Sequence, residues 1–395
     1  MAKNLFLITN PGSSSRKYAL YDDDKPVCTL HFEYEGDSVI CTVKTADGTK
    51  KKLDQTFIDL SGTVSHLGKI LESEGYLGGN TKLKAIIARA AAPGDYFTED
   101  HVVDDECLWQ LELAKNRAPL HVPVIAKEIE QLVAAFEGTP VLAVSDSGFH
   151  NDRPASTIYY AIDTRLADKT ELKRYGFHGL SVGSIVEYMK KQDILPEKLI
   201  VCHIGSGSSV TSVLNGKSYD TTMGYTPLEG VMMSTRCGNM DVAAAFALKR
   251  QLGIDTENGF IEYLSQKGGL RGVSGKTDDM REILKLRDAG DEKALLAYEM
   301  YVSRIQSAIG RMAAVMDGVD AIVFTATIGE RSDDMREWVC RKLHYLGFNL
   351  DQDKNLGKMP ERHTNIGTKD SKPIWVIRTD EFEEMIRRAK ILLAK

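Results

Sequence analysis

Short β-branched hydrophobic runs alternate along the chain with stretches of helical spacing. Residues 5–9 (LFLIT) and 199–202 (LIVC) are typical of buried strands, because they are short apolar runs that end at turn residues. Residues 85–88 and 141–144 have the same character, whereas residues 123–136 carry apolar side chains at the spacing of an amphipathic helix. The pattern therefore predicts a mixed α/β fold.

One arrangement of strands and turns occurs twice. The strand at residues 5–9 is followed by a Gly/Ser-rich turn, a second strand at residues 17–21 and a tight turn. About 190 residues later, the strand at residues 199–202 is followed by a Gly/Ser turn, a strand at residues 210–214 and an Asn-Gly hairpin signal. We interpret the repeat as a duplicated domain; the alternative is a chance match of two hairpins.

Length and repeat together predict two domains. A chain of 395 residues is too long for one comfortable core. The boundary is expected near residues 146–151, with residues 1–146 as the N-terminal domain and 147–378 as a C-terminal nucleotide-binding domain. The last helix, residues 379–395, is expected to return to the first domain. In the second domain, a strand at residues 321–325 leads into a Gly-containing turn and then a polar helix.

Composition narrows the classes of function. The formal net charge of −6 argues against nucleic acid as the main partner, because binding to a phosphate backbone relies on clustered Lys and Arg. No apolar run approaches the roughly 18 residues that span a bilayer, and the first residues are too short for a signal peptide. The six cysteines form no CxxC pair, which indicates reduced thiols and argues against zinc. We expect a cytoplasmic protein with small-molecule partners and no membrane partner.

The two Gly/Ser turns are candidate phosphate sites. A phosphate chain needs several N–H donors without a side chain in the way, and Gly and Ser meet this need at residues 10–17 and 205–208. In the first turn, Ser13 and Ser15 add hydroxyls and Lys17 adds a cation. This turn matches neither GxxxxGK[ST] nor GxGxxG, so alone it is a weak signal. Two such turns in equivalent places favour a nucleotide.

Several basic side chains stand in apolar or tight segments. Arg89 follows a strand and is flanked by Ala, and Arg236 lies in another apolar stretch, where a guanidinium needs a partner. An anion shared by both would supply one, since the planar fork matches carboxylate and phosphate oxygens. His178 lies in a tight YGFHG loop, and His121 follows an Ala-Pro-Leu sequence. For each of the four, a salt-bridged or hydrogen-bonded structural role is the alternative.

Two carboxylates are candidates for the chemistry of a metal-bound nucleotide. Asp146 comes directly after the strand at residues 141–144, where loops leave α/β sheets. Glu381 stands near the start of the last helix, where complementing the helix dipole is an adequate alternative role. ATP chemistry needs Mg²⁺, which prefers oxygen ligands. The residues alone therefore predict a nucleotide-using enzyme with an anionic co-substrate.

The motifs together resemble the acetate kinase family. The segments that carry the resemblance, in chain order, are residues 10–17, 146–150, 175–181, 220–230, 236–238, 279–282, 324–330 and 379–381. The resemblance covers essentially the whole chain, although residues 36–57 carry no family motif. It implies two duplicated RNase H-like domains of the actin and sugar-kinase type, with an active-site cleft between the domains, and a homodimer.

The resemblance also implies a reaction: reversible phosphoryl transfer from ATP to acetate, giving acetyl phosphate and ADP, with Mg²⁺ or in its place Mn²⁺. A carboxylate is already nucleophilic, so the protein has to align it with the γ-phosphorus and neutralise spreading negative charge. By position, the implied metal residues are Asn10 and Glu381, and the implied catalytic residues are Asp146, His178 and Arg236.

The remaining implied roles concern the two substrates. The residues expected around the carboxylate and its methyl group are Arg89, Ala91, Leu120, His121, Phe177 and Pro227. The residues expected at the nucleotide are Ser13, Ser15, Lys17, His203, Ile204, Gly205, Ser206, Gly207, Asp279, Met280, Arg281, Thr327, Ile328, Gly329, Glu330 and Arg331.

The chain departs from the family pattern in both substrate regions. The family segment Arg-Val-Val-His-Gly-Gly is RAAAPG here, and Ala91 stands where a valine encloses the acyl methyl. We expect a roomier pocket that also takes propionate or butyrate, since one methylene decides only about 1–3 kcal/mol. Ser206, Thr327 and Arg331 also depart from the usual residues, which leaves GTP or pyrophosphate open as donor. The alternative functions are a propionate or other short-chain acyl kinase and a catalytically weakened, actin-like nucleotide-binding protein.

Overall fold

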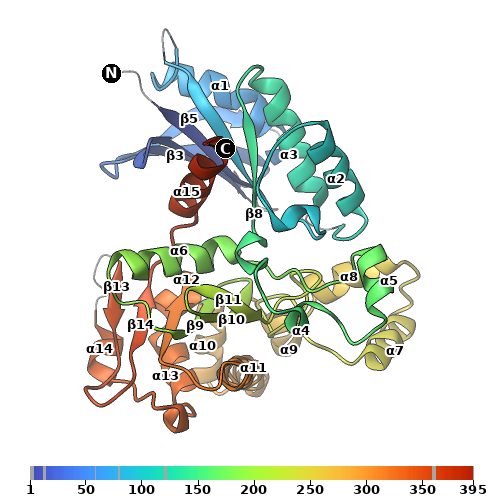
Figure 1. Cartoon of the computed structure of the whole chain (residues 1–395), viewed down its shortest axis with the longest axis vertical. Coiled ribbons are helices and arrows are strands. Elements are labelled where there is room, and N and C mark those ends of the chain that lie inside the picture. Colours follow the sequence, from blue (N-terminus) through green and yellow to red (C-terminus); the bar gives the residue numbers. More distant parts are fainter. Residues whose placement is uncertain are drawn as a thin grey trace. The chain divides into compact units, whose positions relative to one another are not determined.

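The structure is a computed structural model, and it divides the chain into two compact units. It describes residues 4–11, 15–57, 59–78, 81–119, 122–357 and 362–394, so the candidate residues Ser13, Leu120 and His121 lie outside the described residues. The first unit comprises residues 1–148 and 381–395, and the second comprises residues 149–380 (Figure 1). Each division lies two residues beyond the boundary expected from the sequence.

The first unit is built on a sheet that has eight strands within the described ranges, in the order β5-β4-β3-β2-β1-β6-β8-β7. The strands are β1 (Leu5–Pro11), β2 (Ser15–Asp22), β3 (Lys25–Glu35), β4 (Ser38–Thr45), β5 (Lys50–Phe57), β6 (Leu83–Ala90), β7 (His101–Val102) and β8 (Val141–Ser145). Strands β1 to β5 pair antiparallel, whereas β1, β6 and β8 run parallel. The segment without a family motif thus supplies β4 and β5, which extend one side of the sheet.

Helices cover both faces of this sheet. They are α1 (Thr63–Ser73), α2 (Asp105–Lys115), α3 (Val122–Ala135) and α15 (Glu381–Leu393). Leu5 and Leu7 of β1 share a core with residues of α1 and α3, while the alternating Phe6 and Ile8 face the other side. The C-terminal helix α15 also contacts β1, β6 and β8. Figure 1 shows this red helix among the blue elements of the first unit, to which residues 381–395 belong.

The second unit has its own sheet, with the order β11-β10-β9-β12-β14-β13. Its strands are β9 (Lys198–Ile204), β10 (Ser208–Leu214), β11 (Lys217–Thr221), β12 (Ala321–Thr325), β13 (His363–Asn365) and β14 (Ile374–Ile377). Strands β9, β12 and β14 are parallel, and the others pair antiparallel. The two sheets therefore repeat one plan: an antiparallel three-strand meander whose first strand is followed by two parallel neighbours. This repeat confirms the predicted duplication.

Helices also cover both faces of the second sheet. The helices of this unit, within the described ranges, are α4 (Ala155–Ile158), α5 (Thr164–Thr170), α6 (Gly179–Lys191), α7 (Val242–Leu252), α8 (Glu257–Gln266), α9 (Gly269–Ser274), α10 (Met280–Asp288), α11 (Glu292–Val315), α12 (Ala326–Arg331), α13 (Asp333–Cys340) and α14 (Gln352–Leu356), and not all of them pack on the sheet. Helix α6 packs in one core and α11 in the other. Across the described ranges, no helix has both the length and the apolar content to cross a membrane.

Most local predictions are confirmed, and one is wrong. The seven predicted strands all fall within β1, β2, β6, β8, β9, β10 and β12, and the predicted helix is α3. Asn215 and Gly216 both have positive φ, as the two-residue hairpin turn requires. The residues after β12, predicted as a Gly-containing turn before a helix, are themselves the helix α12. The chain changes direction within one residue, Ala326, whose φ is 65°, so no separate turn is needed.

Candidate active site

In the first unit, the carboxyl ends of three parallel strands bring candidate residues together. Asn10 is the second-last residue of β1, and Arg89 is the second-last residue of β6. Asp146 directly follows β8. Arg89 is opposite Val144 in the register, one strand residue before the end of β8. Loops at the carboxyl ends of parallel strands are where α/β sheets place ligands. Arg89 belongs to its strand instead of following it, which makes its backbone rigid.

These side chains form one connected group with Glu381, which we call the Arg89 cluster (Asn10, Arg89, Asp146 and Glu381). Arg89 Nη2 donates to Asp146 Oδ2 at 2.8 Å, and Arg89 Nη1 donates to Asn10 Oδ1 at 3.3 Å. Asn10 Nδ2 in turn donates to Glu381 Oε2 at 3.4 Å. Asp146 is fully buried, while 23% of the Arg89 side chain is exposed. The structure thus joins both predicted metal residues to a predicted arginine and aspartate.

The Arg89 guanidinium is held in its charged form. Burial alone lowers the pKa of Arg89, but the negative charges of Asp146 and Glu381 outweigh it and raise that pKa above its ordinary value. Among the described residues, Arg89 Nε is a buried donor without a hydrogen-bond partner. The arginine is therefore a fixed cation with unused donor capacity, which suits the binding of an anion.

The oxygen atoms of the Arg89 cluster fit a magnesium ion. Mg²⁺ is usually bound by one or two carboxylates, substrate phosphates and several waters. The Asn10 amide and the Glu381 and Asp146 carboxylates supply hard oxygen ligands of this kind. Within the described ranges, no three His, Cys, Asp or Glu side chains gather closely enough to hold a metal by themselves. These oxygen donors therefore suit a metal ion that takes its remaining ligands from the phosphates of the bound nucleotide and from water.

The first hairpin places one predicted residue beside this cluster and contains an ion pair that the sequence did not reveal. Lys17 is paired with Asn10 across the hairpin and is exposed, and Ser15 begins β2. The intervening Arg16 points the opposite way and pairs with the buried Glu128 of α3, at 2.8 Å from Nη1 to Oε2. Burial raises the pKa of Glu128 to about 7, despite the attraction of Arg16. Only the alternation of strand side chains could have indicated the inward arginine.

The segment after β6 carries the predicted acyl-pocket residue of this unit. Ala91 is half-buried and packs against the core of the first unit. Ala92, Pro93 and Gly94 behind it are buried. A methyl group is thus all that the chain presents at Ala91, two residues after Arg89.

In the second unit, His178 is fixed by its backbone and by two neighbours. It precedes α6 with a φ of 61°, a left-handed conformation that is uncommon outside glycine. His178 Nδ1 is hydrogen-bonded to Ser209 Oγ at 3.0 Å, and its ring stacks on His203 with 4.0 Å between centroids. His203 Nδ1 is itself hydrogen-bonded to Ser181 Oγ at 2.8 Å. These contacts fix the orientation of the imidazole ring, and with it the direction in which Nε2 points.

That direction is toward Gly207 and Arg236. A Cβ added to Gly207 would lie 3.3 Å from His178 Nε2 and 3.0 Å from Arg236 Nη1, so the imidazole and the guanidinium border the space that a side chain would fill. Arg236 Nη1 also reaches the Pro227 carbonyl at 3.5 Å. We call His178, His203, Gly207 and Arg236 the His178 cluster. Bare backbone beside an imidazole and a guanidinium provides room and positive charge for a phosphate.

Two further predicted residues flank this cluster. Pro227 contacts Arg236 through its carbonyl. Phe177, the residue before His178, is buried, and its carbonyl accepts a hydrogen bond from His150 Nε2 at 3.0 Å. The loop that carries His178 is thus anchored at the preceding residue, Phe177, by His150.

The second unit also contains a pocket of about 520 Å³. Its lining consists of Ser206, Ser234, Asp278, Asp279, Met280, Arg281, Leu284, Thr327, Ile328, Arg331, Ser332 and Asp333. Its volume lies in the range of small-molecule sites. Seven predicted nucleotide residues are among the lining residues, whereas Ser234, Asp278, Leu284, Ser332 and Asp333 were not predicted. The segment around Ser234 is held there because its N–H donates to the Ser206 carbonyl at 3.2 Å.

Other predicted nucleotide residues support the pocket from outside its lining. Glu330 Oε1 accepts from the backbone N–H groups of Ala326 and Thr379, at 3.1 and 3.3 Å. The buried Arg336 donates to the Gly329 and Glu330 carbonyls at 2.8 and 2.9 Å, which fixes the end of α12. His203, Ile204, Gly205 and Gly207 lie at the end of β9 and in the turn that follows, next to Ser206.

Comparison with known proteins gives one consistent result. The family model described as the acetokinase family matches residues 5–388. The acetate kinase of Carboxydothermus hydrogenoformans is 37% identical over 400 residues, covering 98% of each chain. The acetate kinase of Heliobacterium modesticaldum is 37% identical over 366 residues, covering 90% of this chain and 91% of its own.

Solved structures agree with this result. The acetate kinase of Porphyromonas gingivalis superposes with a TM-score of 0.86 at 30% identity, covering 99% of this chain and 100% of the other. A propionate kinase from Francisella tularensis superposes with a TM-score of 0.88 at 31% identity, covering 98% of each chain.

Proposed function

Because the chain belongs to the acetokinase family, we propose that it catalyses reversible phosphoryl transfer from ATP to acetate, giving acetyl phosphate and ADP. The predicted resemblance, fold class and enzyme class are all confirmed by the similarity, since the relatives are kinases that act on a carboxylate. The roles of individual residues below are our proposal for how this chain performs the reaction.

One observation carries the proposal: His178 Nε2 and Arg236 Nη1 meet at the bare backbone of Gly207, and the adjacent Ser206 lines the 520 Å³ pocket. A nucleotide in that pocket would direct its phosphates toward a guanidinium and an imidazole. Phosphoryl transfer spreads negative charge over the equatorial oxygens, and preorganised hydrogen-bond donors and cations stabilise that charge. We assign this role to His178 and Arg236.

The Arg89 cluster is proposed to serve the same reaction. Arg89 would bind an oxygen of the carboxylate or of the transferring group, while Asp146 holds the guanidinium in place and keeps it charged. Since a carboxylate needs no strong base to attack phosphorus, orientation and charge neutralisation are the main tasks of these residues.

We propose that Asn10 and Glu381, supported by Asp146, hold the divalent metal, with Mg²⁺ as the expected ion and Mn²⁺ as a substitute. The oxygen donors around Arg89 support this assignment. When bound, the ion would neutralise phosphate charge. The protein's own contribution is the orientation of the Glu381 carboxylate, which Asn10 holds by a hydrogen bond.

A propionate or short-chain acyl kinase is the second candidate. The observation that favours it is Ala91, a half-buried residue two positions after Arg89, in a run of small residues. We propose that the enzyme accepts propionate and butyrate alongside acetate. ATP is the proposed donor, and GTP and pyrophosphate are the competing donors because Thr327 and Arg331 line the nucleotide pocket.

The test is to trap acyl phosphate with hydroxylamine after incubation with ATP, Mg²⁺ and each carboxylate. We expect hydroxamate from acetate, and also from propionate and butyrate. ATP hydrolysis without hydroxamate would instead support the actin-like nucleotide-binding protein. A strong preference for acetate would contradict the widened pocket, and replacement of ATP by GTP or pyrophosphate identifies the donor.

We further propose a cytoplasmic homodimer in which α7 contacts a second copy. Helix α7 has no buried residue, and the exposed fractions of Val242 and Phe246 are 69% and 58%. Contiguous exposed apolar side chains commonly mark a protein interface. The six cysteines are free thiols, as expected for a reducing compartment. Light scattering of the wild type and of Phe246→Glu tests the assembly: a wild-type monomer would contradict it.

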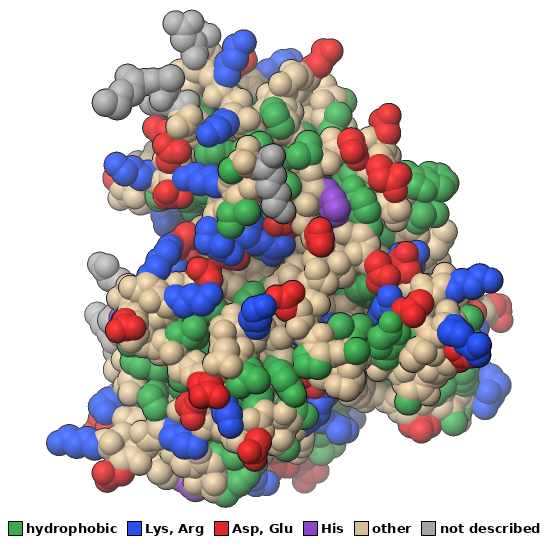
Figure 2. All heavy atoms as spheres, in the orientation of Figure 1, with side chains coloured by type: hydrophobic (Ala, Val, Ile, Leu, Met, Phe, Trp, Pro, Cys, Tyr) green, Lys and Arg blue, Asp and Glu red, His purple; other side chains and the backbone are tan. Residues whose placement is uncertain are grey.

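The proposed partners are small molecules only. In Figure 2, blue basic and red acidic side chains are interspersed over most of the visible face, which fits the formal net charge of −6. A continuous basic surface would be expected for binding to a nucleic-acid backbone.

A further inference from the structure

A bidentate ion pair in the first unit lies next to the Arg89 cluster and outside the predicted site. Arg388 Nε donates to Asp100 Oδ2 at 2.9 Å, and Arg388 Nη2 donates to Asp100 Oδ1. Only 11% of the Arg388 side chain and 16% of the Asp100 side chain are exposed. Two parallel charge-assisted bonds fix the orientation of both groups, which a single contact would not do.

The ion pair is hydrogen-bonded to Ser145, the residue before Asp146. Arg388 Nη1 donates to the Ser145 carbonyl at 2.9 Å, and Asp100 Oδ1 accepts from the Ser145 N–H at 2.8 Å. Both backbone groups of Ser145 are therefore bonded to the same ion pair. Ser145 Oγ also accepts from the N–H of Ser147 at 3.1 Å, so the chain is fixed on both sides of Asp146.

The loop after Asp146 also packs directly on Arg388. A Cβ added to Gly148 would lie 2.2 Å from Arg388 Nη2 and 3.1 Å from its Cζ. No side chain fits there unless the guanidinium moves. Arg388 can therefore keep its place in the ion pair because residue 148 is a glycine.

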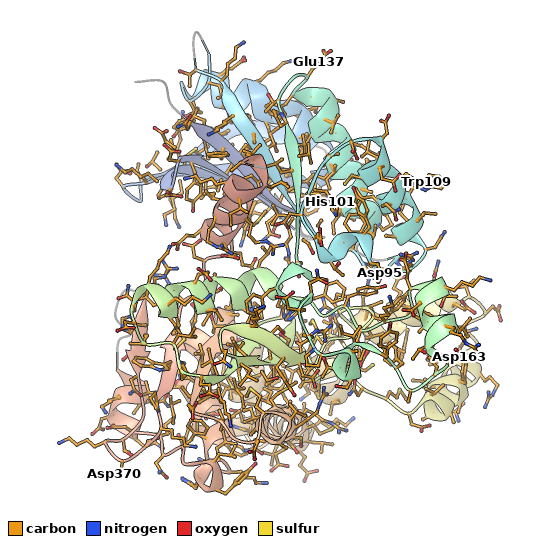
Figure 3. The ribbon with its side chains drawn as sticks, in the orientation of Figure 1. Asp95, His101, Trp109, Glu137, Asp163 and Asp370 are labelled. Carbon is orange, nitrogen blue, oxygen red and sulfur yellow. The ribbon has the colours of Figure 1, made fainter. Side chains whose placement is uncertain are left out.

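The segment that presents Asp100 is itself rigid. His101, labelled in Figure 3, stacks on Tyr96 with 3.8 Å between ring centroids, and its Nε2 is hydrogen-bonded to the Tyr96 carbonyl at 2.8 Å. The Phe97 carbonyl accepts from Ser145 Oγ. Asp100 therefore lies in a segment that is fixed by several contacts. Arg388 lies on a helix that packs on β1, β6 and β8.

Arg388 also belongs to the helix that begins with Glu381. It lies about two turns further along α15. The ion pair thus connects the two elements that carry the carboxylates of the Arg89 cluster: the loop with Asp146 and the helix with Glu381.

We propose that Arg388, through Asp100, is a positioning residue that fixes the Asp146 carboxylate relative to the Glu381 carboxylate for metal and phosphoryl binding. The inference rests on the proposed function, because it assigns a task to the support of that site. Displacements of about 1 Å in a catalytic arrangement can cost about a hundredfold in rate, so a lost fork should be visible in kinetics without unfolding the protein.

The main test is Arg388→Lys, which keeps the charge but removes the fork. We expect kcat for acyl phosphate formation to fall at least tenfold. The concentration of Mn²⁺ needed for half-maximal binding, measured by water proton relaxation in the presence of ADP, should rise at least threefold. Affinity for ADP alone should stay within twofold, because the nucleotide pocket is formed by residues of the second unit.

Arg387→Lys is the matched control. Arg387 is the next residue of α15 and also makes a two-bond pair, with Glu384 at 2.8 and 2.7 Å, but that pair stays within the helix. Its variant should leave kcat and Mn²⁺ binding within twofold of the wild type. Equal losses in both variants would mean that any perturbation of α15 suffices, and would overturn the proposal.

Two variants approach the same pair from other sides. Gly148→Ala displaces the guanidinium while leaving every charge in place, and Asp100→Asn removes one charge. Each should weaken Mn²⁺ binding, and Gly148→Ala combined with Arg388→Lys should be no worse than the more severe single variant, because both break one interaction. Additive losses would contradict a shared role. If Arg388→Lys does not fold, as judged by ADP binding and thermal unfolding, these two variants decide.

The outcomes separate this inference from the proposed function. A wild type that forms no acyl phosphate contradicts the proposed function, while the Mn²⁺ measurements still test the positioning role. An active wild type with Mn²⁺ binding unchanged in Arg388→Lys, Asp100→Asn and Gly148→Ala contradicts the positioning role alone.

Discussion

The two units share one strand plan but fill the carboxyl ends of their strands with different chemistry. In the first unit, Arg89 is paired with Asp146, and Glu381 completes a set of opposite charges. In the second unit, the corresponding edge has a glycine turn, serine hydroxyls, stacked histidines and Arg236, whose guanidinium contacts the neutral Pro227 carbonyl. One copy of the duplicated fold thus carries a cluster in which positive and negative side chains are paired with each other. The other copy carries Arg236 beside the glycine turn next to a pocket. Such a difference is expected because function depends on the site and not on the fold.

The difference has an energetic consequence. A cluster of paired, buried charges contributes to folding as well as to chemistry, because removing one partner leaves the other uncompensated. Arg236 of the second unit donates to the Pro227 carbonyl and to the Met233 sulfur, which are both uncharged, and we expect its loss to affect the chemistry more than the folding. The first unit should therefore couple stability to activity, and the second should separate them.

The largest effect is expected for Arg236→Ala. Loss of this preorganised cation should raise the barrier by about 3–5 kcal/mol, judged from comparable charge contacts, with little change in the thermal midpoint. The measurement is kcat for acyl phosphate formation together with thermal unfolding. Arg165→Ala is the control, because the Arg165 side chain is 91% exposed. An Arg236→Ala enzyme within tenfold of the parent rate would remove Arg236 from the catalytic role.

Asp146→Asn should affect both properties. The substitution removes the fully buried carboxylate that pairs with Arg89, so we expect about 2–4 kcal/mol of lost stability and a fall in kcat of similar size. Urea unfolding and steady-state kinetics on the same preparation measure the two. Full stability with reduced activity would show that the Arg89 cluster does not differ from the His178 cluster in the way described above.

A pH effect should distinguish the two hairpins. Burial raises the pKa of Glu128 to about 7, so the folded state binds its proton more tightly than the unfolded state. The stabilising contribution is complete below the ordinary glutamate pKa and is lost as pH rises through about 7. The change should be on the order of 2 kcal/mol between pH 5 and pH 8, and Glu128→Gln should remove it. The equivalent hairpin of the second unit carries the uncharged Ser208 and Ser209.

The control for this pH effect compares how steeply the free energy of unfolding changes with pH in the two proteins. Urea unfolding of wild type and Glu128→Gln at pH 5, 6, 7 and 8 gives both curves. Identical slopes in the two proteins would contradict the assignment of the effect to Glu128.

The smallest effect concerns the acyl pocket. Ala91→Val restores the bulk that the family pattern has at this position, and it should shift kcat/KM toward acetate over butyrate by about 1–2 kcal/mol. Comparing kcat/KM for acetate, propionate and butyrate in both proteins checks this. Ala46→Val, in a turn between β4 and β5, is the control. An unchanged ratio would place the acyl group elsewhere.

Much of this arrangement could be predicted from the sequence because the signals are local. The buried runs at β1 and β9 and the turns after them are continuous in the chain. Arg89 and Asp146 could be placed at one sheet edge because each stands at the end of a strand-like run. Local patterns are also enough to identify the Asn-Gly hairpin.

What could not be predicted depends on distant partners. Arg388 and Asp100 are 288 positions apart in sequence, and each is an ordinary charged residue in its own segment. The pairing of Arg16 with Glu128 likewise requires β2 to lie against α3. Ser332 and Asp333 enter the pocket only because α12 begins immediately after β12, where the sequence suggested a turn.

The most direct measurement is hydroxamate formation from ATP and acetate by the wild type, Arg89→Ala and Arg236→Ala. If both clusters serve one phosphoryl transfer, the wild type forms acetyl phosphate, and each variant loses at least a hundredfold in rate while ADP still binds. Wild-type ATP turnover without acetyl phosphate, or a variant that keeps the parent rate, would contradict the account.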